Sequence, residues 1–316
     1  MDRILGNDYE TLENLKDLFS IHTWRQRITL DKHYITPGYL FEKEWEIIGL
    51  PNNLDGLTFL DVGANDGMYS FLAEKKGAKK VLATDIYINE GECLNMTEGW
   101  DIRKITLIKK YKNSLIDIVP VSIYQLVDKL REKFDVVFCG NVLAWLNDPL
   151  IGLEQLCLST KKMLIIREDI SNINKPVLEK VRQNGNKFNW IGSKKFYIDY
   201  FQSMGFTKVE FRIIDEWPIF LERKTHFPYF ELKDNINVFN HPFSDNGIIK
   251  KVNNHKVLPS LLNVNGFLYF NELGWIKEDE AKKVDSPIPK NYIKRKIFEW
   301  KFRKNSLQNC VIYAYK

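Results

Sequence analysis

Short apolar runs alternate with amphipathic segments through the middle of the chain. Runs of this kind are typical of buried strands, and they predict strands at 58–62, 80–84, 116–121, 134–139 and 161–167. Two further apolar runs predict strands at 208–214 and 310–315. Because strands that alternate with helices form parallel sheets covered on both faces, the pattern predicts an α/β fold with a doubly wound, seven-stranded, Rossmann-like sheet.

Other segments show the spacing of amphipathic helices or follow the signals at which helices begin and end. Helices are predicted at 10–20, 68–76, 175–184 and 193–204. The first of these, together with the aromatic residues of 21–50, predicts a helical and aromatic N-terminal arm over residues 1–50. The core domain is then expected to cover residues 51–215 and 308–316.

The last two predicted strands are separated by residues 216–307, a segment too long for a loop inside a compact domain. It is rich in proline, asparagine and aromatic residues, and Asn265-Gly266 predicts a turn between strands at 257–264 and 267–271. We interpret this insertion as a substrate-recognition subdomain beside the carboxyl ends of the strands, where ligands bind in open α/β sheets. A structural role or an oligomer interface is the alternative.

Composition agrees with a soluble globular protein, since 44% of the residues are hydrophobic and 28% are charged. No apolar run reaches the roughly 18 residues of a membrane span, and the first residues lack the apolar stretch of a secretory signal. The four cysteines are far apart, which indicates reduced thiols and a cytoplasmic protein.

Charge is uneven along the chain, whose formal net charge is +5. A basic cluster near the C-terminus contains Lys290, Lys294, Arg295, Lys296, Lys301, Arg303 and Lys304. Such a cluster suits an anionic partner such as tRNA. The alternative is a solvated helical face that only keeps the protein soluble.

The most specific chemical signal is the run from Thr58 to Gly67. It predicts a strand ending near Asp61, then a loop with Gly63 and Gly67, then a helix whose first N–H groups are open. The next strand ends at Asp85, at the distance where a carboxylate accepts hydrogen bonds from the two hydroxyls of a ribose. Together the two signals predict a nucleoside cofactor site. The alternative is an ordinary strand-to-helix turn with a helix-capping aspartate.

These residues resemble a known family. Residues 59–85 are similar to motifs I and II of class I S-adenosylmethionine-dependent methyltransferases, and residues 134–150 to the region of motif IV. With Trp190-Ile191-Gly192-Ser193, they resemble the subgroup of the tRNA wobble-uridine carboxymethyltransferases. The chain departs from that subgroup in two features. Ala144 and Trp145 replace a Tyr-His pair, and Asn189 stands where the wobble enzymes have a tyrosine that binds a carboxylated cofactor.

The resemblance implies S-adenosylmethionine as the cofactor and assigns its contacts. The methionine end would be held by Asp61, Gly63, Asn65 and Gly67. Asp85 would bind the ribose, while the adenine would lie against Ile86, Ser122 and Ile123. Asn141 would sit near the sulfonium and the substrate entrance.

Methyl transfer to oxygen benefits from a general base, for which the chain offers several candidates. We favour Asp169, His241 and His226 over His22, His33 and Asp148. The sequence shows no cluster with the spacing of metal ligands, so no metal is expected. The first hypothesis is O-methylation of a small molecule or saccharide. A tRNA-modifying methyl- or carboxymethyltransferase is the second, and a non-catalytic S-adenosylmethionine-binding protein is the third.

Overall fold

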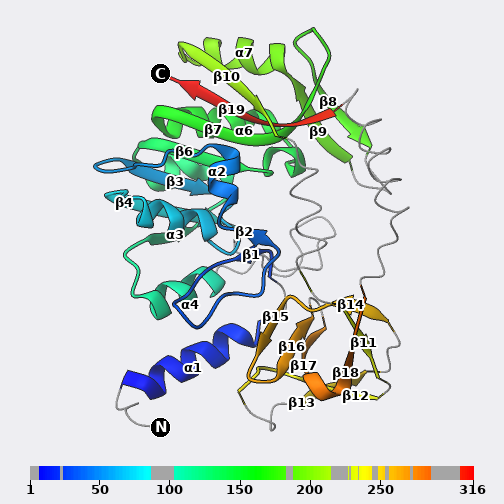
Figure 1. Ribbon diagram of the computed structural model, residues 1–316. Coiled ribbons are helices and arrows are strands. Elements are labelled where there is room, and N and C mark those ends of the chain that lie inside the picture. Colours follow the sequence, from blue (N-terminus) through cyan, green and yellow to red (C-terminus); the bar gives the residue numbers. More distant parts are fainter. Residues whose placement is uncertain are drawn as a thin grey trace.

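Seven neighbouring strands form the central row of the nine-stranded main sheet in the computed structural model, and two further strands, described below, join it at one side (Figure 1). In order across the sheet the seven are β10 (Lys208–Ile213), β19 (Leu307–Tyr315), β7 (Thr160–Ser171), β6 (Phe134–Gly140), β3 (Thr58–Val62), β4 (Lys80–Asp85) and β5 (Asp117–Pro120). The structure describes residues 7–21, 24–86, 103–182, 188–214, 227, 229–233, 235–243, 248–252, 256–270, 273–285 and 307–316.

Strand direction follows the expected pattern. β3 pairs in parallel with β4 and β6, and parallel pairing continues outward to β5 and β7. β19 is antiparallel to both of its neighbours, β7 and β10. The last two strands are therefore adjacent although the long insertion separates them in sequence. The predicted doubly wound, seven-stranded sheet with an insertion between its last two strands is confirmed.

Helices cover both faces of this sheet. One face carries α2 (Glu44–Ile48), α3 (Met68–Lys75) and α4 (Arg103–Lys112). The other carries α5 (Leu126–Leu130), α6 (Pro149–Ser159) and α7 (Lys194–Ser203). Phe59 enters the first core and its neighbour Leu60 the second, because successive side chains of a strand point to opposite faces. None of the described helices is long and apolar enough to cross a membrane.

Two of these helices begin at side-chain caps that the sequence encodes. The Asp148 carboxylate accepts hydrogen bonds from the backbone N–H groups of Leu150 and Ile151 at the start of α6. The Ser193 hydroxyl accepts one from Phe196 N at the start of α7. Asp148, a candidate base in the sequence, therefore has a structural role as a helix cap.

The helix predicted at 175–184 is wrong. Leu178–Arg182 forms strand β8, which pairs antiparallel with β9 (Phe188–Ser193), and the end of β9 continues in parallel beside β7. The spacing of Leu178 and Val181 suits a helix locally, but pairing with β9 determines the conformation. Asn184-Gly185, a strong signal for a hairpin turn, lies in the sequence between the two strands.

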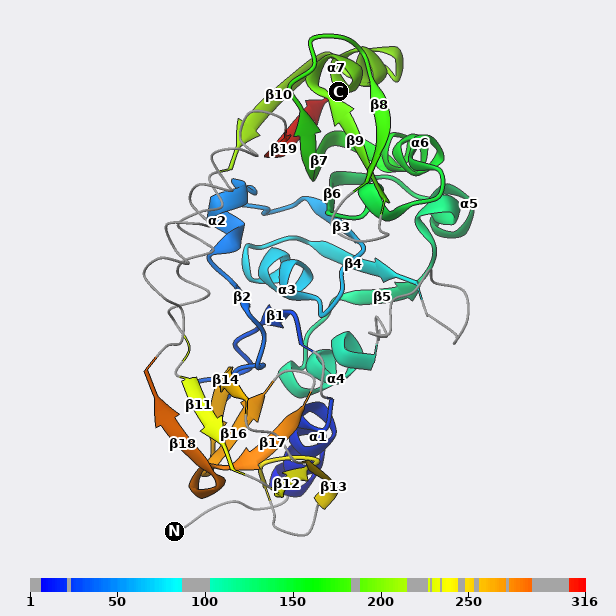
Figure 2. The same cartoon turned by 90° about the vertical axis from the view of Figure 1, so that its right-hand side faces the viewer.

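The insertion contains two small antiparallel sheets (Figures 1 and 2). The first has the order β14 (Val257–Pro259), β11 (Tyr229–Leu232) and β18 (Ala281–Val284), with the short helix η3 (Glu278–Glu280) leading into β18. The second has the order β13 (Ile248–Val252), β12 (Ile236–Phe239), β17 (Gly274–Lys277), β16 (Phe267–Phe270) and β15 (Leu262–Val264). Asn265 and Gly266, both with positive φ, form the predicted turn between β15 and β16.

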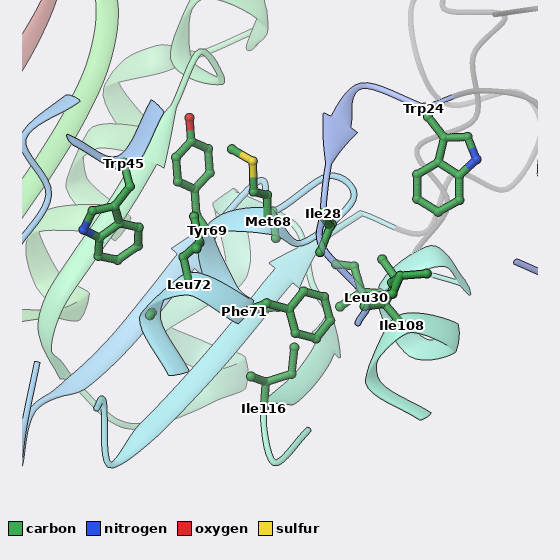
Figure 3. Close-up of a cluster of buried hydrophobic side chains, with 14 of the residues drawn as sticks. Trp24, Ile28, Leu30, Trp45, Met68, Tyr69, Phe71, Leu72, Ile108 and Ile116 are labelled. Carbon is green, nitrogen blue, oxygen red and sulfur yellow. The ribbon is translucent and has the colours of Figure 1, made fainter. Parts of the chain in front are cut away.

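The N-terminal arm connects the sheet to the insertion. It consists of α1 (Asn7–Phe19) and the paired short strands β1 (Gln26–Arg27) and β2 (Leu40–Phe41). Figure 3 shows Trp24, Ile28 and Leu30 of the arm in one buried cluster with Phe71 of α3 and Ile108 of α4. The arm therefore packs over the helices that follow β3 and β4.

The insertion lies against this arm. The indole N–H of Trp275 donates to Phe19 O at 2.7 Å, and the two rings meet edge to face. Arg27 reaches Leu261 O through its guanidinium at 2.9 Å. Both views place the two insertion sheets beside α1, far from β10 and β19, the strands that flank the insertion in sequence (Figures 1 and 2). In the described part of the insertion, these contacts anchor it to the arm.

Candidate functional site

The loop after β3 has the backbone shape that its glycines predict. Gly63, Asn65 and Gly67 have φ values of 74°, 56° and 92°, in the left-handed region. A Cβ on Gly63 would lie 2.4 Å from Cγ2 of Val142, which follows β6. Glycine is therefore required here both by the backbone conformation and by close packing of the loop on the next crossover.

Asp61 lies beneath this loop and is almost fully buried. Its carboxylate accepts a hydrogen bond from the Ser70 hydroxyl of α3 at 2.7 Å. Burial raises the pKa of Asp61 to about 7, and the nearby Asp85 adds to the rise. A positively charged group at this position would stabilise the ionised form of Asp61.

Asp85 joins the end of β4 to the glycine loop. One carboxylate oxygen accepts from Asn65 N and the other from Ile86 N, each at 2.8 Å. Burial raises the pKa of Asp85 to about 6, despite these two hydrogen bonds. A carboxylate has about four acceptor positions, so both oxygens can also accept from a ligand. Ile86, the next residue, exposes 38% of its surface beside the carboxylate.

The segment after β5 is placed near this end of the sheet. Val121 N donates to Asp85 O, which brings the residues that follow β5 beside the end of β4. The Ser122 hydroxyl accepts from Tyr124 N and caps the short helix η1 (Ile123–Gln125). Ile123 is buried in the core beneath α5 and α6. Both residues thus have structural contacts of their own.

Buried hydrogen bonds join the arm to the glycine loop, and the sequence did not predict them. The Asp66 carboxylate is fully buried and accepts from Arg25 N and Gln26 N at 2.7 Å each, and from Lys104 Nζ at 2.9 Å. Gln26 Oε1 accepts from Met68 N at the start of α3. The first N–H group of α3, expected to be open, is therefore occupied by the arm. The partners are about 40 residues apart in sequence, so no local signal indicates them.

A pocket of about 200 Å³ opens where β6 and β7 end. It is lined by Asn141, Ala144, Trp145, Glu168, Asp169, Asn189, Trp190 and Ile191. Asn141 has a φ of 57°, and its N–H donates to Arg167 O. Asp169, the predicted base on β7, lines this pocket, and one of its oxygens accepts from Asn309 Nδ2 at 3.3 Å.

Glu168 is a site residue that the sequence reasoning missed. Its Oε1 accepts from Leu143 N at 2.8 Å, in the short helix η2 (Leu143–Trp145). Burial raises the pKa of Glu168 to about 8, although backbone N–H groups favour the carboxylate. The buried Asn189 Oδ1 has no hydrogen-bond partner. A pair of adjacent acids at the end of a predicted core strand was the available signal for Glu168.

His241, a candidate base that the structure describes, lies elsewhere. His241 follows β12 in the insertion, where its Nδ1 accepts from Phe243 N. Burial lowers the pKa of His241, and Lys16 of α1 lowers it further. The structure thus places His241 against the arm rather than in the pocket. His22, His226 and the basic cluster from Lys290 to Lys304 lie outside the described residues.

The strand order, with an antiparallel seventh strand between the fifth and the sixth, is that of class I methyltransferases. The chain has the class I methyltransferase fold. No protein-family model matches the chain. A stretch of 98 residues is 35% identical to ribosomal protein L11 methyltransferase from Lactobacillus johnsonii, and it covers 27% of this chain and 31% of that protein.

Solved structures of similar shape include the [4+2]-cyclase SpnF, with 11% identity, a TM-score of 0.49, and coverage of 99% of this chain and 95% of that one. The N-terminal domain of EvdMO1 with SAH bound shows 11% identity and a TM-score of 0.45, over 66% and 90%. Magnesium protoporphyrin IX methyltransferase from Synechocystis PCC 6803 shows 12% identity and a TM-score of 0.39. The match covers 68% of this chain and 80% of that one. Likenesses of this degree say nothing about activity, which has to be inferred from the residues of the site.

Proposed function

We propose that the chain is an S-adenosylmethionine-dependent methyltransferase that methylates an oxygen of a small molecule or saccharide. The assignment of the cofactor rests on the arrangement of residues where β3 and β4 end. There a left-handed glycine loop is hydrogen-bonded to the buried Asp85 carboxylate, and the apolar Ile86 is exposed beside it. Adenosine needs these features: an acceptor for the ribose hydroxyls and an apolar surface for the base.

The two buried carboxyl groups of this site fit the positive charge of S-adenosylmethionine. Asp61 and Asp85 are both buried with raised pKa values, so a cationic ligand is favoured close to them. In this proposal Asp85 accepts from the ribose, and Ile86 contacts the adenine with Ser122 and Ile123. The loop residues Asp61, Gly63, Asn65 and Gly67 hold the methionine end.

The pocket at Asn141 suits the acceptor because it lies next to the glycine loop. Val142, which follows Asn141 in the chain, packs closely against Gly63 of that loop. S-adenosylmethionine supplies an electrophilic methyl group, and methylation of a hydroxyl oxygen releases one proton. Among the residues that line the pocket, Asp169 is the one that can take that proton, because the raised pKa of Glu168 keeps that group protonated at neutral pH. His241, which lies against the arm, has no place in this proposal.

The tRNA alternative finds less support in the same pocket. Its lining contains Glu168 and Asp169, and among its eight residues, all described, none is Lys, Arg or His. A phosphate or a carboxylated cofactor would meet acids there. Asn189 lines the pocket where a tyrosine holds the carboxylate in the wobble enzymes that the sequence resembles.

Calorimetry with S-adenosylhomocysteine tests the cofactor assignment. We expect Asp85→Ala to weaken binding by about 1–3 kcal/mol, because charge-assisted hydrogen bonds to the ribose are lost. Asp117→Ala is the matched control, since this exposed aspartate begins β5 at the opposite end of the sheet. Equal affinities for wild type and Asp85→Ala, or no binding by the wild type, would reject the assignment.

A transfer screen then tests the acceptor class. Wild-type protein is incubated with methyl-labelled S-adenosylmethionine and either neutral sugars, phenols or tRNA. Label in a sugar or phenol supports the proposal. Label in tRNA alone would replace it with the RNA-modifying alternative, and cofactor binding without label in any acceptor would favour the non-catalytic one.

A further inference from the structure

The pocket beside Asn141 contains carboxyl and amide oxygens that can accept hydrogen bonds. Glu168 and Asp169 bring carboxyl groups to it from β7, and Asn189 brings an amide from β9. No basic side chain is among the lining residues, which all belong to the described part of the chain. A ligand with hydroxyl donors can therefore be bound here, and anionic groups are disfavoured beside the acids.

Asn189 identifies where one donor is missing. Its side-chain oxygen is buried and has no partner, and the residue exposes only 7% of its surface. Buried polar atoms without a partner are rare because they lose hydration without compensation. Other described residues, among them Ser159 and Asn237, also carry a buried oxygen without a hydrogen-bond partner, but Asn189 lines the pocket. Because the oxygen itself is buried, a ligand hydroxyl would supply the missing hydrogen bond once the side chain turns toward the pocket.

Aromatic rings line the pocket together with these polar groups. Trp190 is held in place by its indole N–H, which donates to Leu146 O at 3.0 Å. Trp145 lines the pocket and exposes 45% of its surface. Lys180 Nζ lies 5.5 Å from the centre of the Trp190 ring but is not part of the lining. Rigid indole rings with nearby acceptors suit a ligand that has apolar C–H faces and hydroxyl edges.

The charge of the pocket favours a neutral ligand over a cation. Burial raises the pKa of Glu168 to about 8, so this group is largely protonated at neutral pH. One Asp169 oxygen already accepts from Asn309. An ammonium group would gain less from such a pocket than from a pair of free carboxylates.

We propose that this pocket binds a neutral polyhydroxylated ring, whose hydroxyl groups donate to Asn189 Oδ1 and to the acids of β7. This inference rests on the proposed transferase function and names its acceptor class. Asn189 acts by binding, and the cost of leaving its oxygen unpaired is recovered when the ligand is present.

Calorimetric titration of a matched sugar panel tests the inference. The panel contains neutral hexoses, pentoses and 6-deoxyhexoses, each beside its phosphate ester and its amino derivative, with and without S-adenosylhomocysteine. We expect at least one neutral sugar to bind wild-type protein roughly ten-fold more tightly than its charged counterparts. Asn189→Leu should lower that affinity roughly ten-fold and leave the melting temperature equal or higher. Asn237→Leu, the control, should leave sugar affinity unchanged.

Three results would overturn the inference: no neutral sugar binds, a phosphate or amino counterpart binds as tightly, or Asn189→Leu binds like the wild type. The comparison in wild-type protein stands even if the leucine variant does not fold. Binding of S-adenosylhomocysteine without any sugar would reject the inference and leave the transferase proposal intact. Sugar binding without S-adenosylhomocysteine binding would reject the transferase proposal alone.

Discussion

Two halves of the proposed site are built in different ways. The cofactor half is formed mainly by Asp61, the loop Gly63–Gly67, Asp85 and Ile86 from two consecutive strands, with Ser122 and Ile123 added from the segment after β5. The pocket half, formed by the eight residues that line the cavity, comes from the ends of β6 and β7, from η2 and from β9. A site made from neighbouring residues leaves a motif in the sequence, whereas a site assembled from distant strands does not.

The halves also differ in how their polar groups are satisfied. In the cofactor half, Asp66, Gln26 and Lys104 form a buried network that fixes the arm on the glycine loop. In the pocket half, Asn189 Oδ1 is unpaired, and the pKa of Glu168 is strongly raised. The first arrangement stabilises the fold, and the second keeps binding groups available at a cost in stability.

The largest effect should follow removal of the buried network in the cofactor half. We expect Asp66→Ala to lower the free energy of unfolding by about 3–5 kcal/mol, because the Lys104 ammonium and two backbone N–H groups are left buried without a partner. Urea denaturation measures this loss. Glu132→Ala breaks the half-exposed pair with Lys80 and should cost below about 1 kcal/mol. Similar losses in the two variants would show that Asp66 does not hold the arm.

A smaller effect is expected in the pocket half, where the wild-type side chain, rather than its replacement, lowers stability as the pH rises. Burial raises the pKa of Glu168 from 4.5 to about 8, so the folded state keeps a proton that the unfolded state releases. Its contribution to stability is complete below pH 4.5 and is lost as the pH rises toward 8. Between about pH 5 and 8, the free energy of unfolding of the wild type should therefore fall by on the order of 3 kcal/mol relative to that of Glu168→Gln.

Urea denaturation across this pH range measures the difference. Glu154→Gln, on the exposed side of α6, controls for the loss of one carboxyl group. A constant difference between wild type and Glu168→Gln would contradict the burial of Glu168, and the contrast between the two halves would then be smaller than described.

Much of the framework was predictable from local patterns. The apolar runs located all seven strands of the main sheet, and Asn265-Gly266 located a turn of the insertion. Asp61, the glycines and Asp85 were found because they lie within one strand–loop–helix–strand unit. Their roles toward a cofactor remain predictions.

The failures share a physical cause. Residues 178–182 have a helical spacing of apolar side chains, yet strand pairing with β9 determines their structure. Asn189 was singled out by resemblance, but its place in the pocket depends on β9, a strand that the sequence did not predict. Asp66 and Gln26 depend on contacts across about 40 residues, which no local pattern encodes. Glu168 acquires its raised pKa only through burial in the folded chain.

A crystal structure of the protein with S-adenosylhomocysteine tests whether the site has separate cofactor and acceptor halves. We expect the ribose hydroxyls to lie on the Asp85 carboxylate and the adenine on Ile86. We also expect the pocket at Glu168 and Asn189 to stay open for an acceptor. A nucleoside bound in that pocket, or crystals from which the nucleoside is absent at saturating concentration, would contradict the division of the site into two halves.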